Sequence, residues 1–147
     1  MTALLDVNVL LAMLWPRHSF FRHASGWFAK NHGNGWASCP LSQAGFVRLY
    51  TQRAVIGMDI SAQEAMDVLK KNCAPSLHHV FWPQEFSVLE LLPEIRRRLI
   101  GHKQLTDAIL LDLAIRKGGR LVTLDQRVAN LLPPDSPHRS AIEVIPV

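Results

Sequence analysis

The apolar positions of the chain fall into short continuous runs and longer helical periods. The first run, Thr2 to Leu5, has the length of a buried strand, and the apolar residues from Val7 to Leu14 continue up to Pro16. A proline disfavours helical backbone at the residue before it. We therefore predict a strand, a break at Asp6 and a helix that ends before Pro16.

Further helices are predicted where start and stop signals enclose a periodic segment. Ser19 can cap a helix from Phe20 to about Asn31, which the glycines of Gly33-Asn34-Gly35 stop, and Pro40 can begin a helix to about Arg53. The other predicted helices are Ala62 to Lys71 behind a capping box of Ser61 and Glu64, about Ser87 to Ile100, Asp107 to Lys117 capped by Thr106 and stopped by Gly118-Gly119, and one or two turns over Gln126 to Leu132.

Short apolar runs between these helices predict the remaining strands. They are Trp36 to Ser38, His78 to Trp82, Arg120 to Leu124 and Ile142 to Ile145. Strands that alternate with helices favour an α/β fold with a parallel sheet covered on both faces. No repeat, low-complexity tract or linker interrupts the pattern, so we expect a single domain over residues 1–147.

Composition agrees with a folded domain. The 147 residues match the size of one domain, and 48% hydrophobic with 19% charged residues is opposite to the balance of a disordered chain. No run of about 18 apolar residues and no signal-peptide pattern is present, so we expect neither a membrane span nor secretion. Cys39 and Cys73 are too few for a zinc ribbon or a disulfide scaffold, and we expect reduced thiols in a cytoplasmic protein.

Three aspartates are expected at one end of the sheet. Asp6 follows the first predicted strand, and Asp125 follows the strand from Arg120 to Leu124. In open α/β sheets, ligands bind beyond the carboxyl ends of the strands. Asp107 lies in the first turn of a helix, in line with its apolar stripe, so we expect it to point toward the protein body.

Converging carboxylates raise one another's pKa values unless a cation offsets their charge. An all-oxygen ligand set favours Mg²⁺ or Mn²⁺ over zinc. Such a cation can polarise a phosphodiester and lower the pKa of a bound water, so hydrolysis of a nucleic acid backbone is the natural chemistry. Asn8, Ser42 and Thr123 can support the site, although ordinary capping explains each of them equally well.

The other charged residues are assigned to the surface. Asp112 and Arg116 are spaced to pair on a helix face, and we expect that face to be solvated. The net charge of +4 permits a polyanionic partner without establishing one. A basic group before Asp107 is expected to place positive charge near the mouth of the cleft, where it can bind the phosphates of a nucleic acid. Its members are Arg96, Arg97, Arg98, His102 and Lys103.

Several segments together resemble the PIN-domain ribonucleases, specifically the VapC-like toxins of type II toxin-antitoxin systems. They include Leu4 to Leu10, Trp36 to Arg48, Leu105 to Ala108 and Leu121 to Asp125. Their order and spacing make the match specific, and the similarity covers nearly the whole chain. The resemblance implies a PIN-like three-layer α/β/α sandwich with a central sheet of about four to five strands. It also implies an Mg²⁺- or Mn²⁺-dependent endoribonuclease, neutralised by a VapB-like antitoxin and commonly homodimeric.

The same resemblance assigns roles to individual residues. Asp6, Asp107 and Asp125 fall on the family's metal-binding acids, and Thr123 on its supporting hydroxyl position. Gln43 departs from the pattern, because many PIN domains have Glu there. A neutral amide keeps an oxygen ligand but removes one negative charge. Metal binding should then be weaker or more water-mediated. Because some VapC-like proteins also carry Gln here, we still predict an active enzyme with three acids and with Gln43 as an outer ligand.

Two other functions share some of these features. Phosphoryl-transfer domains also place an aspartate after the first strand, but the haloacid-dehalogenase-like group requires a second one at the position of Asn8. Receiver domains require an adjacent acidic pair and a late Lys-Pro, which this chain lacks. The other alternative is a weakened PIN scaffold that binds RNA or protein without cleaving it, and Gln43 is the feature that favours it.

Overall fold

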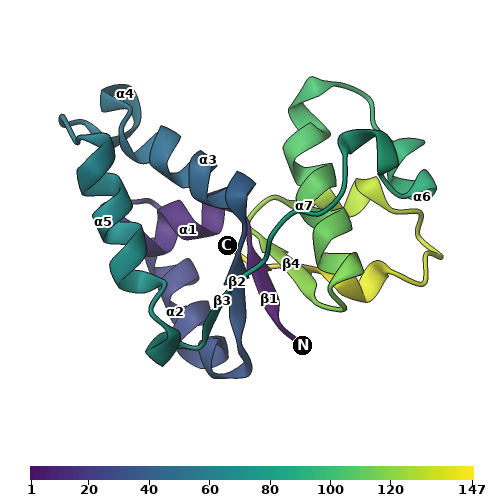
Figure 1. Cartoon of the computed structure of the whole chain (residues 1–147), viewed down its shortest axis with the longest axis horizontal. Helices are drawn as coiled ribbons and strands as arrows, with labels where there is room; N and C mark the ends of the chain where they lie inside the picture. The colour runs from purple at the N-terminus through teal and green to yellow at the C-terminus, as the bar shows by residue number, and fades with distance from the viewer.

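A five-stranded parallel sheet forms the middle of the molecule (Figure 1). The structure is a computed structural model that describes all of residues 1–147. The strands are ordered β3-β2-β1-β4-β5, and every neighbouring pair is parallel, as predicted. Their bounds are β1 Ala3–Leu5, β2 Trp36–Ser38, β3 His79–Phe81, β4 Arg120–Thr123 and β5 Ile142–Val144.

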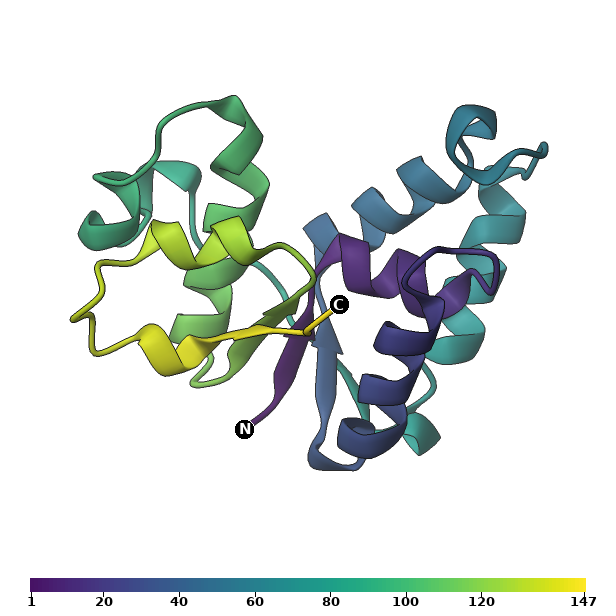
Figure 2. The same ribbon diagram turned by 180° about the vertical axis from the view of Figure 1, so that it is seen from behind.

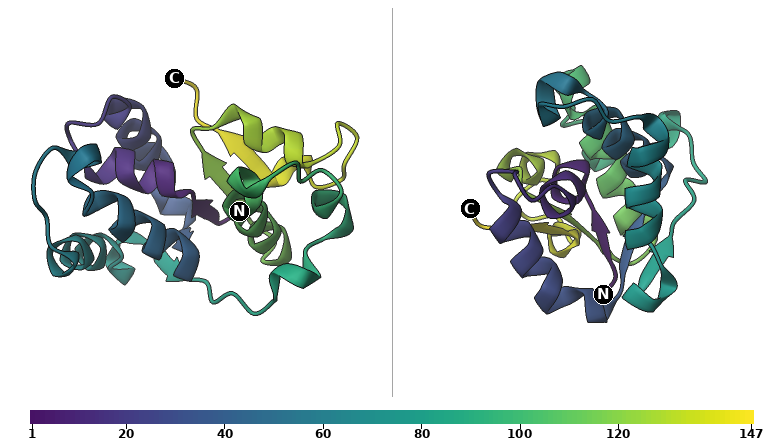
Figure 3. Two further views of the ribbon diagram at one scale, coloured as in Figure 1. Left: turned by 90° about the horizontal axis from the view of Figure 1, so that it is seen from above. Right: turned by 90° about the vertical axis from the view of Figure 1, so that its left-hand side faces the viewer.

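Helices cover both faces of this sheet, which confirms the three-layer α/β/α architecture. On one side lie α1 (Val7–Leu14), α2 (Phe21–Asn31), α3 (Pro40–Tyr50), α4 (Arg53–Ile56) and α5 (Ala62–Asn72) (Figures 1 and 2). On the other side lie α6 (Pro93–Arg96), α7 (Leu105–Arg116) and the C-terminal segment (Figure 3). Short 3-10 turns cover His32–Asn34, Pro75–Leu77, Val88–Glu90, His102–Gln104, Gln126–Leu131 and Arg139–Ala141.

The two hydrophobic cores follow from the alternation of side chains along the strands. Leu4 and Leu121 pack with α7 on one face. Leu5 and Val122, each one residue further along, pack with α1 and α2 on the other. Because both faces of the central strands are buried, these strands are continuously apolar, as parallel strands usually are.

Several predicted boundaries are close to those observed, and one predicted helix is wrong. The helix from Val7 to Leu14 and the strand from Trp36 to Ser38 are confirmed, and Ser61 caps α5 by accepting the Glu64 amide at 3.0 Å. The expected helix from Ser87 to Ile100 is instead a 3-10 turn followed by the four residues of α6. Pro93 accounts for the break, since it disfavours helical backbone at the preceding residue.

Two predicted caps and one predicted helix end are also wrong. Ser19 does not cap α2, which begins after Phe20 without a side-chain cap. Thr106 does not cap α7, because that helix begins one residue earlier at Leu105. The helix from Pro40 ends at Tyr50, and a separate short helix, α4, follows it. Both cysteines are free, as expected, and no helix has the length and apolar character needed to cross a bilayer.

Asp112 is buried, which contradicts its assignment to a solvated helix face. Its side chain is 0% exposed. The expected pairing with Arg116 is present, but the carboxylate also accepts the backbone amide of Leu92 at 2.7 Å. A helical spacing predicts that two charges pair, but it does not show whether another segment of the chain covers them. Here the segment before α6 covers Asp112 and is attached to α7 through it.

Replacing Gly45 by Ala is expected to destabilise the fold by about 1–3 kcal/mol, the range for overpacking a tight contact. A Cβ at Gly45 of α3 would lie 2.6 Å from one methyl of Val7 and 3.2 Å from the other, at the start of α1. Gly26→Ala in α2 is the matched control, since nothing lies within 4 Å of its Cβ. Urea unfolding should show a loss for the first and none for the second; equal midpoints would contradict this packing.

Candidate active site

Asp6 and Asp125 lie at the carboxyl ends of the neighbouring strands β1 and β4. Asp6 caps α1, with one carboxylate oxygen accepting the Val7 amide at 2.7 Å. Its other oxygen accepts the hydroxyl of Thr123 at 2.6 Å. Asp6 is buried directly after β1, at the edge of the sheet, and two hydrogen bonds hold its carboxylate in place.

Thr123 and Asn8 join the two strand ends in one network. The Thr123 hydroxyl oxygen accepts the Asp125 amide and the Asn8 side-chain amide, each at 3.1 Å, while it donates to Asp6. The side-chain oxygen of Asn8 accepts the backbone amide of Leu124, also at 3.1 Å. Both side chains therefore fix the Asp6 carboxylate relative to the backbone that carries Asp125.

Asp107, in the first turn of α7, is the residue common to two adjoining cavities. One, of about 280 Å³, is lined by Asp6, Asn8 and Asp107 among others. The second, of about 130 Å³, is lined by Asp107, Asp125 and Arg127 among others. Asp107 is half-buried, and none of the side-chain hydrogen bonds within the chain involves its carboxylate.

The acids have different proton affinities. Burial raises the pKa of Asp6, against the hydrogen bonds from Thr123 and Val7. Burial, followed by repulsion from Asp6 and Asp125, raises the pKa of Asp107 to about 7. Arg127 has the opposite effect on Asp125, whose pKa it lowers through hydrogen bonds and an ion pair at 2.9 Å.

The donor set at this edge fits a hard divalent cation. It consists of carboxylate and amide oxygens, and the Asp107 carboxylate has no partner of its own. No three His, Cys, Asp or Glu side chains lie close enough together to ligate one ion directly. Arg127 accounts for part of this, since it holds the Asp125 carboxylate. Asp6 and Asp107 therefore form the part of the set that is available in one cavity.

The raised pKa of Asp107 predicts a specific pH dependence of stability. Between its ordinary value of 3.8 and about 7, the folded chain holds a proton that the unfolded chain has released. The free energy of unfolding therefore falls as pH rises through this window. Since Asp107 is partly exposed, the effect is small. Between pH 5 and pH 8, the free energy of unfolding of Asp107→Asn should rise relative to that of the wild type by only about 1–2 kcal/mol.

Urea unfolding of both proteins at the two pH values, with EDTA present, measures this difference. The comparison with Asp107→Asn removes the contributions of the other titrating groups, which both proteins share. Parallel pH profiles for the two proteins would show that the Asp107 carboxylate is not perturbed by burial and by its acidic neighbours.

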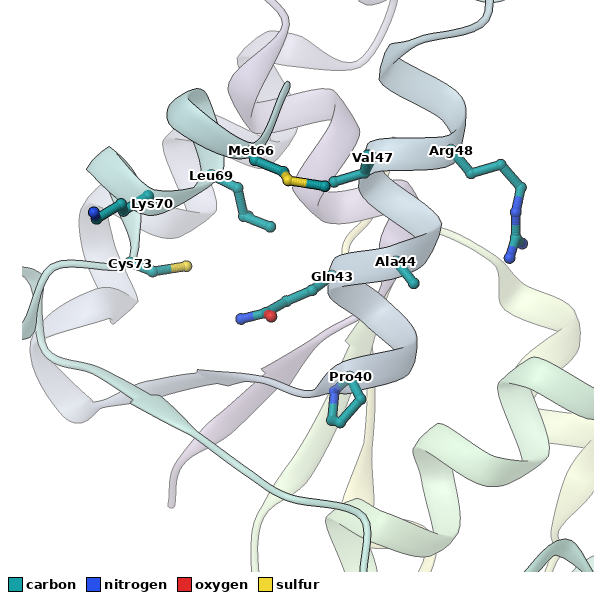
Figure 4. Close-up of a pocket in the computed structure, with 9 residues that line it drawn as sticks. All are labelled: Pro40, Gln43, Ala44, Val47, Arg48, Met66, Leu69, Lys70 and Cys73. Atoms are coloured by element: carbon teal, nitrogen blue, oxygen red, sulfur yellow. The ribbon is translucent and has the colours of Figure 1, made fainter. Parts of the chain in front are cut away.

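Gln43 lies away from the acids, and Ser42 has the ordinary capping role that was its alternative. Gln43 lines a separate cavity of about 750 Å³ between α3 and α5, where it points toward Cys73 (Figure 4). Its amide nitrogen donates to Ser38 at 2.9 Å. Ser42 is buried and satisfies the backbone of Cys39 as part of the α3 cap. The structure therefore does not bring Gln43 to the acids, contrary to its expected position as an outer ligand.

The basic group is only partly gathered at the acids. Lys103 lines the Asp125 cavity, and His102 is exposed in the same 3-10 turn. Arg98 instead donates to the carbonyl of Asn130 at 2.7 Å. Arg96 reaches only the carbonyl of Leu89, and Arg97 lines neither acid cavity.

Sequence reasoning missed three residues that border the acids: Gly45, Arg48 and Arg127. Gly45 and Arg48 are three residues apart in α3, with Leu41 four residues earlier. This spacing places all three on one helix face, but only the packing of α3 shows that this face meets the acids. Arg127 is two residues after Asp125, where it can pair with the preceding carboxylate.

Comparison with known proteins assigns the family. The sequence profile of the family described as "PIN domain" matches residues 3–131. The chain belongs to the PIN-domain family. Two relatives from Mycobacterium tuberculosis (strain ATCC 25618 / H37Rv) place this PIN domain with the VapC proteins. It is 39% identical to "Ribonuclease VapC39" over 146 residues, which cover 99% of this chain and 100% of the relative. It is 43% identical to "Ribonuclease VapC44" over 129 residues, covering 88% and 89%.

A solved structure shares the fold of this PIN domain. The match is to a chain of "Crystal structure of VapBC2 from Rickettsia felis bound to a DNA fragment from their promoter", with a TM-score of 0.57. The alignment covers 90% of this chain and 96% of that one at 16% sequence identity. The similarity confirms the PIN-like arrangement of the sheet and helices.

Proposed function

We propose that this PIN domain is an endoribonuclease that hydrolyses RNA phosphodiester bonds with the help of Mg²⁺ or Mn²⁺. One observation carries the proposal: Asp6 and Asp107 face the same cavity, where burial, followed by repulsion from Asp6 and Asp125, raises the pKa of Asp107 to about 7. The relation to VapC39 and VapC44, both named ribonucleases, supports RNA as the substrate.

Each residue at the sheet edge has a distinct part in this proposal. Asp6 and Asp107 hold the cation, and Asp125 lies in the adjoining cavity, where Arg127 pairs with it. Thr123 and Asn8 orient Asp6 through the hydrogen bonds described above. When bound, the cation polarises the phosphodiester and lowers the pKa of the attacking water. Burial of Asp6 strengthens its interaction with the cation, because less water screens the charges.

The position of Gln43 favours the enzyme over the weakened binding scaffold. That alternative depended on the loss of one negative charge beside the acids. Gln43 lies in the cavity between α3 and α5 and hydrogen-bonds to Ser38, so its neutrality does not reduce the charge at Asp6 and Asp107. The remaining donors are the same three acids from which activity is expected.

The test is cleavage of a structured RNA by the purified protein with Mg²⁺, with Mn²⁺ and with EDTA. The proposal predicts cleavage with at least one of the two cations and none with EDTA. RNA that binds but stays intact with both cations would contradict it and would favour the binding scaffold. Cleavage that persists in EDTA would also contradict it.

We also propose a VapB-like antitoxin as the partner that neutralises the activity. The relation to the VapC proteins supports this. A small reading frame directly upstream, encoding a DNA-binding protein, is the candidate. Co-expression should yield a complex that no longer cleaves RNA; a pair that neither associates nor loses cleavage would contradict the assignment.

The remaining expectations belong to the same proposal. We expect residues 1–147 to act as one domain in the cytoplasm, and as a homodimer with twice the 16.5 kDa mass of one chain. Light scattering of the purified protein measures that mass directly. The group from Arg96 to Lys103 stays a predicted RNA-binding surface, with Lys103 the member nearest the acids.

A further inference from the structure

Arg48 is the cation that α3 presents to the acid cavity. It lies in the last turn of α3 and lines the cavity together with Asp6, Asn8 and Asp107. Figure 4 shows its side chain extending from α3 in a direction away from Gln43, into the space on the other side of the helix. Arg48 also borders the cavity between α3 and α5, so it lies between that cavity and the acid cavity.

The guanidinium of Arg48 has no partner within the chain, whereas most other arginines do. Arg53, Arg116, Arg120 and Arg127 pair with carboxylates, and Arg96, Arg98 and Arg139 donate to backbone carbonyls. Arg17, Arg22 and Arg97 are also unpaired, but they line neither acid cavity. Arg48 is therefore an exposed, unpaired cation beside two carboxylates that it does not neutralise.

Positive charge also borders the acids on their other side. Lys103 lines the smaller cavity, which meets the larger one at Asp107, and Arg127 in the same cavity is already paired with Asp125. Cations thus lie on both sides of Asp107, with the acids between them. An RNA strand has one phosphate per nucleotide. When one phosphate lies at the acids, the phosphates before and after it can therefore bind the cations on either side. A guanidinium can hold a phosphate by two parallel hydrogen bonds.

We propose that Arg48 binds an RNA phosphate next to the scissile one, on the α3 side of the acids. The inference rests on the proposed nuclease function and adds a path for the substrate. One RNA strand crosses from Arg48 over Asp107 toward Lys103. Gly45, one helical turn before Arg48, sets how closely α3 approaches α1 and hence where this cation stands.

The test measures RNA binding without cleavage, in an Asp6→Asn parent that keeps the RNA intact. Adding Arg48→Gln should weaken binding of a short fluorescent RNA by about tenfold and reduce the salt slope by about 0.7, the loss expected for one single-strand phosphate contact. Arg48→Lys should keep the slope while affinity stays below that of the parent, because Lys keeps the charge without the planar fork.

Arg22→Gln is the matched control, because it removes another exposed and unpaired arginine, from α2 and away from both acid cavities. It should leave affinity and slope unchanged. An Arg48→Gln protein with the affinity and slope of its parent would overturn the inference. This result is independent of the proposed function, which fails instead if the protein with native Asp6 does not cleave RNA. With native Asp6, Arg48→Gln should raise KM with little change in kcat.

Discussion

Replacing Asp6 by Asn is expected to reduce metal-dependent RNA cleavage by more than about 100-fold. Substitutions of residues that only support a metal ligand typically cost about 10- to 100-fold, and Asp6 is proposed as a ligand itself. Asn is nearly the same size and can still accept the Val7 amide that Asp6 now accepts. The helix cap should therefore stay in place, and the loss should come from the missing charge and from the missing oxygen that accepts the Thr123 hydroxyl.

The control is Asp135→Asn, because Asp135 is exposed and lines neither acid cavity. Both variants should have the circular dichroism spectrum of the wild type. Initial rates at saturating Mg²⁺ or Mn²⁺ give the comparison. If Asp6→Asn cleaves as fast as Asp135→Asn, the acid at the end of β1 has no part in the reaction.

Replacing Asp112 by Ala is expected to lower the free energy of unfolding by about 2–3 kcal/mol. Removing one partner of a buried ion pair costs about 3–5 kcal/mol when the other is left without water. Arg116 is 36% exposed, so water can solvate part of its charge and the loss is smaller. The Leu92 amide, however, loses the oxygen that it reaches at 2.7 Å, and an unsatisfied amide costs about 1–3 kcal/mol.

Urea unfolding monitored by tryptophan fluorescence measures this change, with Asp135→Ala as an exposed control that should lie within about 0.5 kcal/mol of wild type. Asp112→Asn should be less damaging than Asp112→Ala, because its carbonyl can still accept the Leu92 amide. A loss no larger than that of the control would mean that Asp112 is solvated, as its helical spacing alone suggested.

The order of the elements could be predicted because it depends on local pattern. Val7 to Leu14 is apolar at helical spacing and Pro16 stops it, so the observed α1 has the predicted ends. The parallel sheet followed from the alternation of strands and helices. The structure of the segment from Ser87 to Ile100 could not be predicted from local pattern. Pro93 breaks the helix, and tertiary contacts such as that between Asp112 and Leu92 fix the conformation of the segment.

The candidate site could be predicted at the strand ends and only partly on the helices. Asp6 and Thr123 are placed by β1 and β4, whose carboxyl ends must share an edge. The side of α3 that faces the acids could not be chosen without the packing of Gly45 against Val7. That packing turns Gln43 away from the acids and Arg48 toward them. A one-residue difference in position on a helix changes direction by about 100°.

The chemical nature of the cut ends tests the central claim most directly. If the acids position a cation that activates water, the nucleophile is water and the 2′-hydroxyl of the RNA takes no part. RNA cleaved by the wild-type protein with Mg²⁺ or Mn²⁺ should then carry phosphate and hydroxyl ends without 2′,3′-cyclic phosphate, and Asp6→Asn should leave the RNA whole. Cyclic phosphate ends, formed equally well in EDTA, would contradict the account.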